Sequence, residues 1–382
     1  MTDKANTVYL SIGSNLGEKL HNLQGAIFLL GKEIGDIVAI SKIYQCPAWG
    51  FNADDFLNAC LEIATDMPAR TVLDRILSIE KKMGRQRTGG TAYQSRNIDI
   101  DILYYNNDVL TSETLTIPHP KLHERRFVLR PLSDIAPQFY HPILEGDTRN
   151  LLQQCKDKDI PQKTSYTLYP NRKELFSRSD FMAIEGNIGA GKTSLAKKIS
   201  ADFNAKLVLE RFADNPFLPN FYKDQTRYAF PLEMSFLADR YQQFSDDTSQ
   251  YDLFKNFMVS DYDIFKSLIF AKITLQKQEF ELYRKIFDFM YKKVKKPKIY
   301  IFLYQTTARL MDNIKKRGRE YEQRITPEYL DCINRGYFDY IKGHPELNSL
   351  VIDISEMDFI SNSKDYETII ESIQNFAIDV SN

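Results

Sequence analysis

Residues 181–199 read FMAIEGNIGAGKTSLAKKI, in which an apolar run leads through a glycine-rich turn into a stretch with helical spacing. From Gly186 to Thr193 the turn fits the pattern G-x-x-x-x-G-K-[ST] in full. Such a turn between a strand and a helix directs backbone N–H groups at a polyphosphate, with Lys192 on the β- and γ-phosphates and the Thr193 hydroxyl on Mg²⁺. A glycine-rich turn without a ligand is the alternative. The residues predicted to surround the phosphates of ATP are Gly186, Asn187, Gly189, Ala190, Gly191, Lys192, Thr193 and Ser194.

The elements predicted on either side of this turn indicate two domains. From the turn onwards, strands are predicted over 181–185, 206–209, 298–304 and 350–354, with helical patterns between them. This alternation predicts an α/β fold with a parallel sheet flanked by helices. Before the turn, short strands over 8–12, 37–44, 56–63 and 98–105 are interspersed with helices, which predicts a compact α+β domain. We expect domains at 1–155 and 179–382, joined by a polar linker at 156–178.

The composition excludes several classes of protein. The chain has 382 residues, a net charge of -1 and 26% charged residues, so its charge gives no indication of nucleic-acid or membrane binding. Four cysteines lie far apart without metal-binding spacing, which predicts a reduced protein without disulfides or zinc. Neither a secretory leader nor a run of 18 apolar residues is present. We therefore expect a cytoplasmic protein.

Four segments that follow the turn carry a family resemblance. They are LVLERFADNPFLPNFYKD (207–224), YAFPLEMSFLADRYQQF (228–244), VSDYDIFKSLIFA (259–271) and KRGREYEQRITPEYL (316–330). In this order they resemble the bacterial deoxynucleoside kinases, in particular the deoxyguanosine and deoxyadenosine kinases, from about residue 181 to the C-terminus. The resemblance implies transfer of the γ-phosphoryl group of ATP to the 5′-hydroxyl of a deoxynucleoside.

The resemblance also implies roles for single residues. Glu210 would be the general base for the 5′-hydroxyl, and Asp261 would join Thr193 on Mg²⁺. Arg317 and Arg319 would form a lid over the transferring phosphate, although the run KRGRE could be only a solvated helix end. The implied nucleoside ligands are Tyr222 and Glu322 for the 3′-hydroxyl, Glu233 for the base edge, Phe270 for stacking and Arg240 near the base. Tyr222 and Phe270 could instead be plain core aromatics.

Two departures from the family pattern stand out. Ser260-Asp261-Tyr262 replaces an acidic-Arg-Ser triplet, so the arginine that supports the base is absent. Asn313 stands where relatives often have a basic residue. Glu233 can accept a hydrogen bond from an amino or ring N–H group, which predicts a purine deoxynucleoside but does not choose between the two purines. We expect deoxyadenosine slightly ahead of deoxyguanosine.

The N-terminal part has an acidic motif of its own, NIDIDIL at residues 97–103. On a strand Asp99 and Asp101 share one face while the isoleucines enter the core, and two adjacent carboxylates favour Mg²⁺. Arginines before and after this motif indicate a polyphosphate site, namely Arg85, Arg87, Arg96, Arg125 and Arg126. A solvent-facing strand with incidental aspartates, or internal salt bridges, are the alternatives.

Six motifs carry a second resemblance. They are GSN (13–15), CPAWG (46–50), FLN (56–58), GRQR (84–87), SRNIDIDIL (95–103) and PHPKLHERRFVL (118–129). From residue 8 to about residue 152 they resemble 6-hydroxymethyl-7,8-dihydropterin pyrophosphokinase. The resemblance implies a ferredoxin-like α/β sandwich and a step of folate synthesis, in which a pyrophosphoryl group passes from ATP to the pterin hydroxymethyl group and AMP leaves.

This resemblance assigns the N-terminal residues. Asp99 and Asp101 would hold two Mg²⁺ ions, and His119 would contact ATP on the side of the leaving AMP. The implied phosphate ligands are Arg85, Arg96 and Arg125, and the implied pterin pocket consists of Cys46, Pro47, Trp49, Phe56, Asn58 and Phe127. The loop from Thr88 to Thr91 lacks the basic residues of relatives, which puts ATP affinity in doubt but not the reaction.

Together the two resemblances predict a bifunctional enzyme. Its partners would be ATP, hydroxymethyldihydropterin and a purine deoxynucleoside, without nucleic acid or membrane. Kinases of the second family are commonly dimers, and residues 232–244 are a candidate interface. A catalytically silent nucleotide-sensing half and a P-loop ATPase are the alternatives.

Overall fold

The structure is a computed structural model that describes residues 5–48, 53–85, 95–211, 215–249 and 254–382. By its internal contacts the chain divides into two units, residues 1–174 together with residue 382, and residues 175–381. None of the described helices carries an apolar stretch long enough to cross a lipid bilayer.

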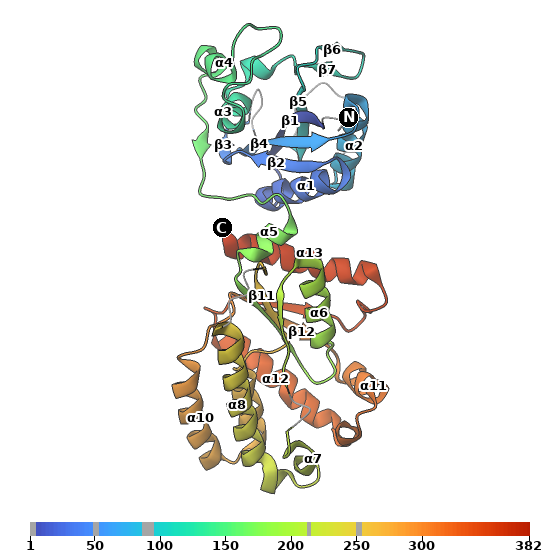
Figure 1. The fold of residues 1–382 in the computed structure, drawn as a ribbon, viewed down its shortest axis with the longest axis vertical. Coiled ribbons are helices and arrows are strands. Elements are labelled where there is room, and N and C mark those ends of the chain that lie inside the picture. Colours follow the sequence, from blue (N-terminus) through green and yellow to red (C-terminus); the bar gives the residue numbers. More distant parts are fainter. Residues whose placement is uncertain (1–4, 49–52, 86–94, 212–214, 250–253) are drawn as a thin grey trace. The chain divides into compact units, whose positions relative to one another are not determined.

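The N-terminal unit is built on a six-stranded antiparallel sheet (Figure 1). The strand order is β5-β1-β4-β3-β8, and β2 also pairs with β4. The strands are β1 (Asn6–Ser14), β2 (Asp36–Ile40), β3 (Tyr44–Cys46), β4 (Phe56–Thr65), β5 (Asp99–Tyr105) and β8 (Gln162–Lys163). A small hairpin of β6 (Leu110–Thr111) and β7 (Thr116–Ile117) lies outside this sheet.

Helices cover both faces of this sheet. One face packs α1 (Lys19–Glu33) and α2 (Ala69–Lys82) onto a core that includes Ile98, Ile100 and Ile102. The other face packs α3 (Arg126–Ile135) and α4 (Thr148–Gln154) onto a core that includes Cys60 and Leu103. The predicted α/β sandwich is therefore confirmed, and the isoleucines of the NIDIDIL motif enter the core as expected.

Two features of this unit differ from the sequence predictions. The strand predicted over 37–44 is interrupted after Ile40, because the Ser41 hydroxyl takes over as acceptor for the Cys60 N–H at 2.8 Å. The stretch predicted as a linker contributes β8, which pairs with β3, and the buried Tyr169. Gln24 on α1 bonds the backbone of Tyr169 in both directions, at 2.7 and 2.8 Å. Part of that stretch therefore belongs to the N-terminal unit.

The second unit is built on a parallel sheet of order β10-β11-β9-β12-β13. The strands are β9 (Phe181–Gly186), β10 (Lys206–Val208), β11 (Met258–Ser260), β12 (Ile299–Tyr304) and β13 (Ser349–Asp353). The strand that leads into the glycine-rich turn is central and fully buried. The predicted parallel sheet flanked by helices is confirmed.

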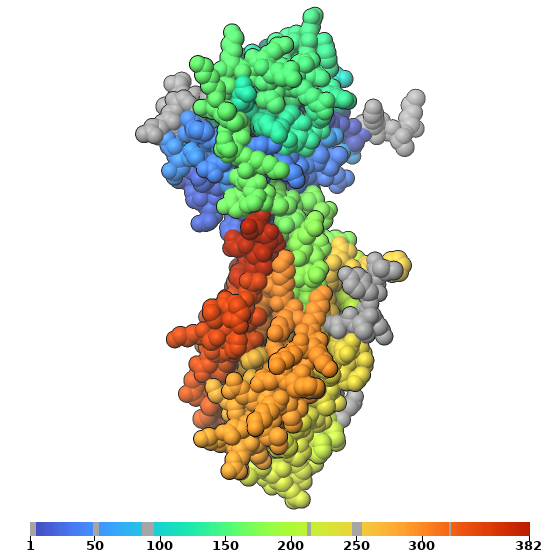
Figure 2. All heavy atoms as spheres, turned by 90° about the vertical axis from the view of Figure 1, so that its left-hand side faces the viewer, coloured from blue at the N-terminus to red at the C-terminus, as the bar shows by residue number. Residues whose placement is uncertain are grey.

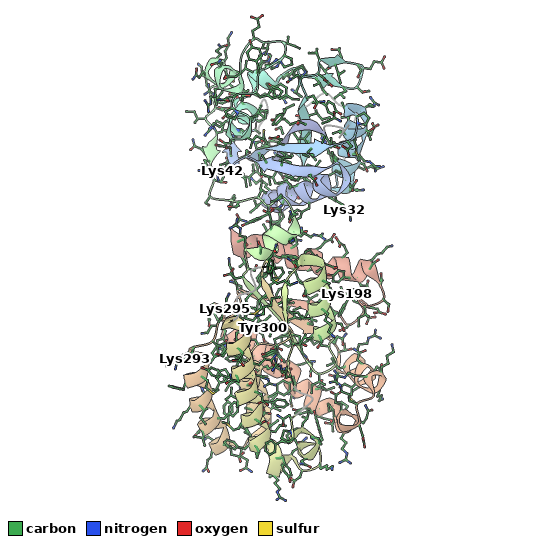
Figure 3. All side chains as sticks on the ribbon, viewed as in Figure 1. Lys32, Lys42, Lys198, Lys293, Lys295 and Tyr300 are labelled. Atoms are coloured by element: carbon green, nitrogen blue, oxygen red, sulfur yellow. The ribbon has the colours of Figure 1, made fainter. Side chains whose placement is uncertain are left out.

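Side chains of the central strands alternate between two helical layers. Phe181 and Ala183 face a cluster with α8 (Gln225–Ser249), α9 (Lys266–Thr274), α10 (Lys277–Tyr291) and α12 (Pro327–Gly343). Helices α6 (Lys192–Phe203) and α13 (Ser363–Ser381) contact the sheet from the other side. Helix α13 forms part of the surface, red in Figure 2, and Figure 3 shows Tyr300 inside the unit and Lys198 on the outside of α6.

Shorter elements complete the unit. They are α5 (Arg172–Ser177), α7 (Leu218–Phe221), α11 (Thr307–Arg317) and the 3-10 turn η2 (Glu320–Arg324). Residues 232–244, the candidate dimer interface, lie within α8, and the homodimer stays a prediction.

Two candidate active sites

One row of residues across the N-terminal sheet connects the predicted pterin and metal ligands. Gly13 on β1 pairs with Asn58 on β4 and with Asp99 on β5, so the three share one face. Two strand spacings of about 4.8 Å place the outer strands roughly 10 Å apart. A Cβ atom on Gly13 would lie 2.7 Å from Asn58 Oδ1, so glycine keeps this row open.

The aspartates lie against the three predicted phosphate ligands. Arg85 Nη1 is 2.8 Å from Asp99 Oδ1, Arg96 Nη1 is 2.6 Å from Asp99 Oδ2, and Arg125 Nη1 is 3.5 Å from Asp101 Oδ2. Burial and the neighbouring Asp99 raise the pKa of Asp101, and Arg125 opposes this rise. The carboxylates and guanidinium groups thus lie together as ion pairs, the arrangement that the salt-bridge alternative describes, and their use as a polyphosphate site stays a prediction.

Glu80 is a member of this site that the sequence analysis missed. Its side chain on α2 is 2% exposed, accepts a hydrogen bond from the Ile100 N–H at 3.0 Å and pairs with Arg85. Glu80 therefore anchors the arginine and the strand that carries both aspartates. The available signal was a glutamate one turn after Ile76, on the apolar face of the predicted helix.

His119 faces the same carboxylates. Its Nδ1 accepts from the Lys121 N–H at 3.2 Å, which leaves the proton on Nε2, 3.9 Å from Asp101 Oδ2. Burial, and then the charge of Arg125, lower the pKa of His119 to about 4. The imidazole is therefore neutral near pH 7 and offers one N–H donor to this site.

The predicted pterin pocket is described in part. Asn58 is 4% exposed, and its Nδ2 has no hydrogen-bond partner among the described residues. Phe56 begins the same strand, and burial raises the pKa of the Cys46 thiol to about 12. Phe127 packs against the α3 core with the Arg125 guanidinium 5.7 Å from its ring centroid, and Pro47 is exposed. Trp49, Arg87 and the loop 88–91 lie outside the described residues.

A pocket in the second unit brings together most residues predicted for the nucleoside kinase site. Its lining includes Gly189, Lys192, Thr193, Glu210, Tyr222, Glu233, Arg240, Asp261, Phe270, Arg317, Arg319 and Glu322. Tyr222 and Phe270 line this pocket and also pack against the core cluster, and their roles as nucleoside ligands stay predictions. The pocket further contains Lys266 and Tyr329, which the sequence analysis did not single out.

The glycine-rich turn has the backbone that its motif requires. Gly186, Gly189 and Gly191 have φ values of 155°, 85° and 85°, in the region that favours glycine. A Cβ atom on Gly186 would lie 2.7 Å from the Leu303 carbonyl oxygen. Lys192 Nζ donates to the Gly186 and Asn187 carbonyl oxygens, both at 2.9 Å. The turn therefore has a curled backbone, and the Lys192 ammonium group bridges two of its carbonyl oxygens.

Amide side chains fix this turn to the neighbouring helices. Asn187 Nδ2 donates to Asn334 Oδ1 on α12 at 2.8 Å, so its side chain points away from the phosphate side. Asn313 Nδ2 on α11 donates to the Gly189 carbonyl oxygen and to Gln305 Oε1, both at 3.0 Å. The asparagine that replaces a basic residue of the relatives therefore braces the turn.

Asp261 links the turn to the predicted base. Its Oδ2 accepts from the Thr193 hydroxyl, and its Oδ1 accepts from the Glu210 N–H at 2.8 Å. Beyond this, Glu210 has one cation on each oxygen, Arg240 Nη2 on Oε1 and Lys266 Nζ on Oε2, both at 2.7 Å. Burial alone would raise the pKa of Glu210, but Lys266 and Arg240 together hold that pKa well below its usual range.

Glu233 lies deeper in the pocket and is 2% exposed. Its Oε1 is 3.0 Å from the Thr274 hydroxyl, and its Oε2 has no hydrogen-bond partner among the described residues. Burial raises the pKa of Glu233 to about 7 although Arg240 and Thr274 oppose the rise. Oε2 of Glu233 is thus available to a ligand, and Oε1 can accept one more hydrogen bond beside that from Thr274.

The run KRGRE closes the pocket. Arg317 Nε donates to Glu322 Oε2 at 3.0 Å, and Arg319 Nη1 donates to Glu322 Oε1 at 3.2 Å. Gly318 ends α11 with a φ of 69°, which turns the chain between the two arginines. Both arginines therefore bind a buried carboxylate from the partly exposed end of α11, and their role as a lid stays a prediction.

Comparison with known proteins gives a match for each unit. Residues 182–378 match the family model "Deoxynucleoside kinase", and residues 9–137 match "7,8-dihydro-6-hydroxymethylpterin-pyrophosphokinase (HPPK)". A deoxyguanosine kinase of Bacillus subtilis is 37% identical over 203 residues, which cover 52% of this chain and 98% of that protein. A 2-amino-4-hydroxy-6-hydroxymethyldihydropteridine pyrophosphokinase of Porphyromonas gingivalis is 39% identical over 147 residues, which cover 38% of this chain and 98% of that protein.

A solved structure of deoxyadenosine kinase from M. mycoides with bound dATP is 24% identical, covers 50% of this chain and 98% of that one, and gives a TM-score of 0.45. The family matches and the two relatives each correspond to one of the two units described above. This chain therefore belongs to the HPPK family through its N-terminal unit and to the deoxynucleoside kinase family through its second unit, and it joins two ATP-dependent kinase domains.

Proposed function

We propose that both domains are catalytic, so that one chain transfers a pyrophosphoryl group to 6-hydroxymethyl-7,8-dihydropterin and a γ-phosphoryl group to a purine deoxynucleoside. The observation that supports the first activity is the row Asn58, Gly13 and Asp99, in which the amide proposed for the pterin edge shares a face with the carboxylate proposed for the metal. The observation that carries the second is the joint contact of Asp261 with Thr193 and with the Glu210 backbone.

The N-terminal residues fit Mg²⁺. Asp99 and Asp101 offer carboxylate oxygens on one face, and the raised pKa of Asp101 beside Asp99 indicates repulsion that a divalent cation would relieve. These two residues would hold the metal, which supplies charge neutralisation on the phosphates of ATP. Cation binding to the aspartates would release Arg85, Arg96 and Arg125 from their ion pairs, so that the guanidinium groups can bind phosphate oxygens.

The N-terminal site would then act through positioning. Phe56 and Phe127 would flank the pterin ring, and Asn58 Nδ2 would donate to its polar edge. The pterin hydroxymethyl oxygen would attack the β-phosphorus, the bond between the β-phosphorus and the α,β-bridging oxygen would break, and AMP would leave. His119 is neutral and would donate its Nε2–H to a phosphate oxygen on the leaving side.

In the second domain Thr193 and Asp261 would hold Mg²⁺, because a hydroxyl and a carboxylate already in contact are the donors that this ion prefers. Lys192 would turn from the Gly186 and Asn187 carbonyl oxygens to the phosphates. Glu210 would take the 5′-hydroxyl proton as the oxygen attacks the γ-phosphorus, and Arg317 and Arg319 would bind the oxygens of the transferring group. Tyr222 and Glu322 would hold the 3′-hydroxyl, and Phe270 would stack on the base.

The purine is proposed from Glu233. An ionised carboxylate suits guanine, which offers two adjacent N–H donors, whereas a protonated one can donate to N1 of adenine and accept from its amino group. Because the pKa of Glu233 is raised to about 7, both the ionised and the protonated carboxyl are populated near neutral pH. Deoxyadenosine is slightly favoured by the sequence, and the Bacillus relative is named as a deoxyguanosine kinase.

Two substitutions test the two-site proposal in the full-length protein. Asp99→Ala should abolish AMP formation with hydroxymethyldihydropterin and leave ADP formation with deoxynucleosides intact, and Lys192→Ala should do the reverse. A panel of the four deoxynucleosides, scored for AMP and ADP separately, gives the base preference. If neither substitution abolishes only its own activity, the two-site proposal is wrong, and a clear pyrimidine preference would contradict the purine assignment.

A further inference from the structure

The proposed base Glu210 is held from two helices at once. Arg240 on α8 reaches Glu210 Oε1 through Nε at 2.8 Å and Nη2 at 2.7 Å, and its Nη1 donates to the Ser267 hydroxyl on α9 at 2.7 Å. Lys266, the first residue of α9, reaches Glu210 Oε2 through Nζ at 2.7 Å. The carboxylate is therefore fixed in both position and rotation, since each oxygen has a different cationic partner.

Lys266 is placed as a functional group rather than as a surface charge. The residue is 5% exposed, and a buried ammonium is strongly unfavourable without a charged partner. Its Nζ lies 5.7 Å from the centroid of the Phe270 ring, and the side chain lines the same pocket as Lys192 and Glu233. Lys266 thus stands between the predicted base-stacking residue and the predicted phosphate ligands.

The charge of Lys266 affects the pKa of three other ionisable groups, namely Glu210, Lys192 and Glu185. After the effect of burial, it is the first charge that lowers the pKa of Glu210, and it also lowers the pKa of Lys192 and opposes the burial-raised pKa of Glu185. Relatives have an arginine in the acidic-Arg-Ser triplet, whereas this chain has Ser260-Asp261-Tyr262, with Tyr262 fully buried and edge-on to Phe244. Here Lys266, at the start of α9, supplies a cation beside Glu210 in addition to Arg240.

We propose that Lys266 is a positioning residue for phosphoryl transfer, which fixes the rotation of the Glu210 carboxylate and aims it at the 5′-hydroxyl. The inference rests on the proposed nucleoside kinase function. In the step itself the 5′-oxygen forms a bond to the γ-phosphorus, its proton passes to Glu210, and the bond from the γ-phosphorus to the β,γ-bridging oxygen breaks so that ADP leaves.

The test uses the full-length protein and the variant Lys266→Met. The expected result is a roughly 100-fold loss of kcat for ADP formation, as for loss of one preorganised polar contact, with KM for ATP changed less than about threefold. Lys266→Arg keeps the charge and a donor for Glu210 Oε2, and it should restore most of the activity.

Two controls separate a positioning role from a structural one. Lys272 is exposed on the same helix, and Lys272→Met should leave kcat and KM unchanged. Lys266→Met keeps the Glu210–Arg240 ion pair, so this single variant buries no uncompensated charge. Glu210→Gln and the double variant with Lys266→Met both leave the buried Arg240 without its carboxylate, so these two variants can be compared directly. If Lys266 acts through Glu210, the double variant should have the kcat of Glu210→Gln alone, and AMP formation should stay at the wild-type rate throughout.

The outcomes that overturn the inference are distinct from failure of the proposed function. If the wild-type chain forms no ADP with any of the four deoxynucleosides, the proposed kinase function is wrong and the inference falls with it. If the wild type is active and Lys266→Met keeps its kcat, the inference alone is wrong. An additive further loss in the double variant also overturns it, because Lys266 would then act independently of Glu210.

Discussion

Arg317 at the end of α11 binds Glu322 in the following turn, with its Nε 3.0 Å from the carboxylate oxygen Oε2. One buried carboxylate therefore contacts the lid and also faces the place proposed for the 3′-hydroxyl of the nucleoside. A substrate hydroxyl that donates to Glu322 would order the carboxylate and, with it, the two arginines. Recognition of the acceptor and placement of the lid would thus share one group.

This relationship predicts how Glu322→Gln behaves. Wild-type enzyme should use a 2′,3′-dideoxy purine nucleoside at least about 10-fold less efficiently than the 2′-deoxy substrate, as expected for one lost hydrogen bond to a charged group. In Glu322→Gln this difference should shrink to about threefold or less, because the amide no longer couples the hydroxyl to Arg317. The measurement is kcat/KM for both substrates, with Glu320→Gln, an exposed residue of the same turn, as the matched control. An undiminished ratio in Glu322→Gln would contradict the coupling.

The pKa of Glu233 predicts a pH-dependent choice of purine. Because burial raises this pKa to about 7, the carboxyl is mostly protonated at pH 6 and mostly ionised at pH 8. The ratio of kcat/KM for deoxyguanosine to that for deoxyadenosine should therefore rise by several-fold between these values. In Glu233→Gln the side chain has one donor and one acceptor at every pH, so the ratio should become flat. A wild-type ratio that is constant from pH 6 to pH 8 is the contrary result.

Gly13 provides a test of the pterin site. In Gly13→Ala the new Cβ atom would meet Asn58 Oδ1 at 2.7 Å, so the amide must move. We expect KM for hydroxymethyldihydropterin to rise about 10-fold, which corresponds to the loss of about one well-placed hydrogen bond. ADP formation in the second domain should be unaffected.

Gly25→Ala is the matched control for this substitution. Gly25 lies within α1, and a Cβ atom there would meet only the Met83 methyl group at 3.7 Å. That variant should keep KM for the pterin and raise the free energy of unfolding by up to about 1 kcal/mol, since alanine favours a helix. Equal effects of the two substitutions on KM would show that Gly13 has no special role.

The brace on the glycine-rich turn predicts a role in ATP binding. Asn313→Leu removes the donor to the Gly189 carbonyl oxygen, and KM for ATP in ADP formation should rise roughly 10-fold at a cost of about 1–2 kcal/mol. Lys315→Leu changes an exposed residue on the same helix and should leave this KM unchanged. A normal KM for ATP in Asn313→Leu would mean that the turn keeps its shape without the amide.

The features predicted correctly from sequence are those with a local pattern. Asp99 and Asp101 share a face because strands alternate with a period of two, and the turn at Gly186 is specified by consecutive residues. Glu80 and Lys266 were not found because their meaning depends on partners far along the chain. Lys266 and Glu210 are separated by 56 positions. Glu210 follows a strand and Lys266 begins a helix, and no rule of sequence spacing predicts contact between two such residues.

The contrast between local patterns and distant contacts also explains why residues 156–178 were predicted as a linker. Strand β8 has only two residues, Gln162 and Lys163, which is too short for any periodicity to appear. Its pairing with Tyr44 and Gln45 follows from the edge that β3 presents, and that edge exists only in the folded sheet. Polar composition and two prolines indicated a linker, and composition alone cannot show that an existing sheet accepts another strand.

Strand β8 therefore determines where the chain can be divided. The Thr164 N–H donates to the Ile43 carbonyl oxygen at 3.0 Å, beside the two paired residues of β8. A fragment that ends at residue 155 would leave β3 with unpaired backbone groups along an open edge, which favours edge-to-edge aggregation. A fragment that ends at residue 174 keeps its own edge strand and should remain monodisperse in light scattering, whereas the shorter one should self-associate. The segment that joins the two domains would thus also prevent the first of them from polymerising through the edge of β3.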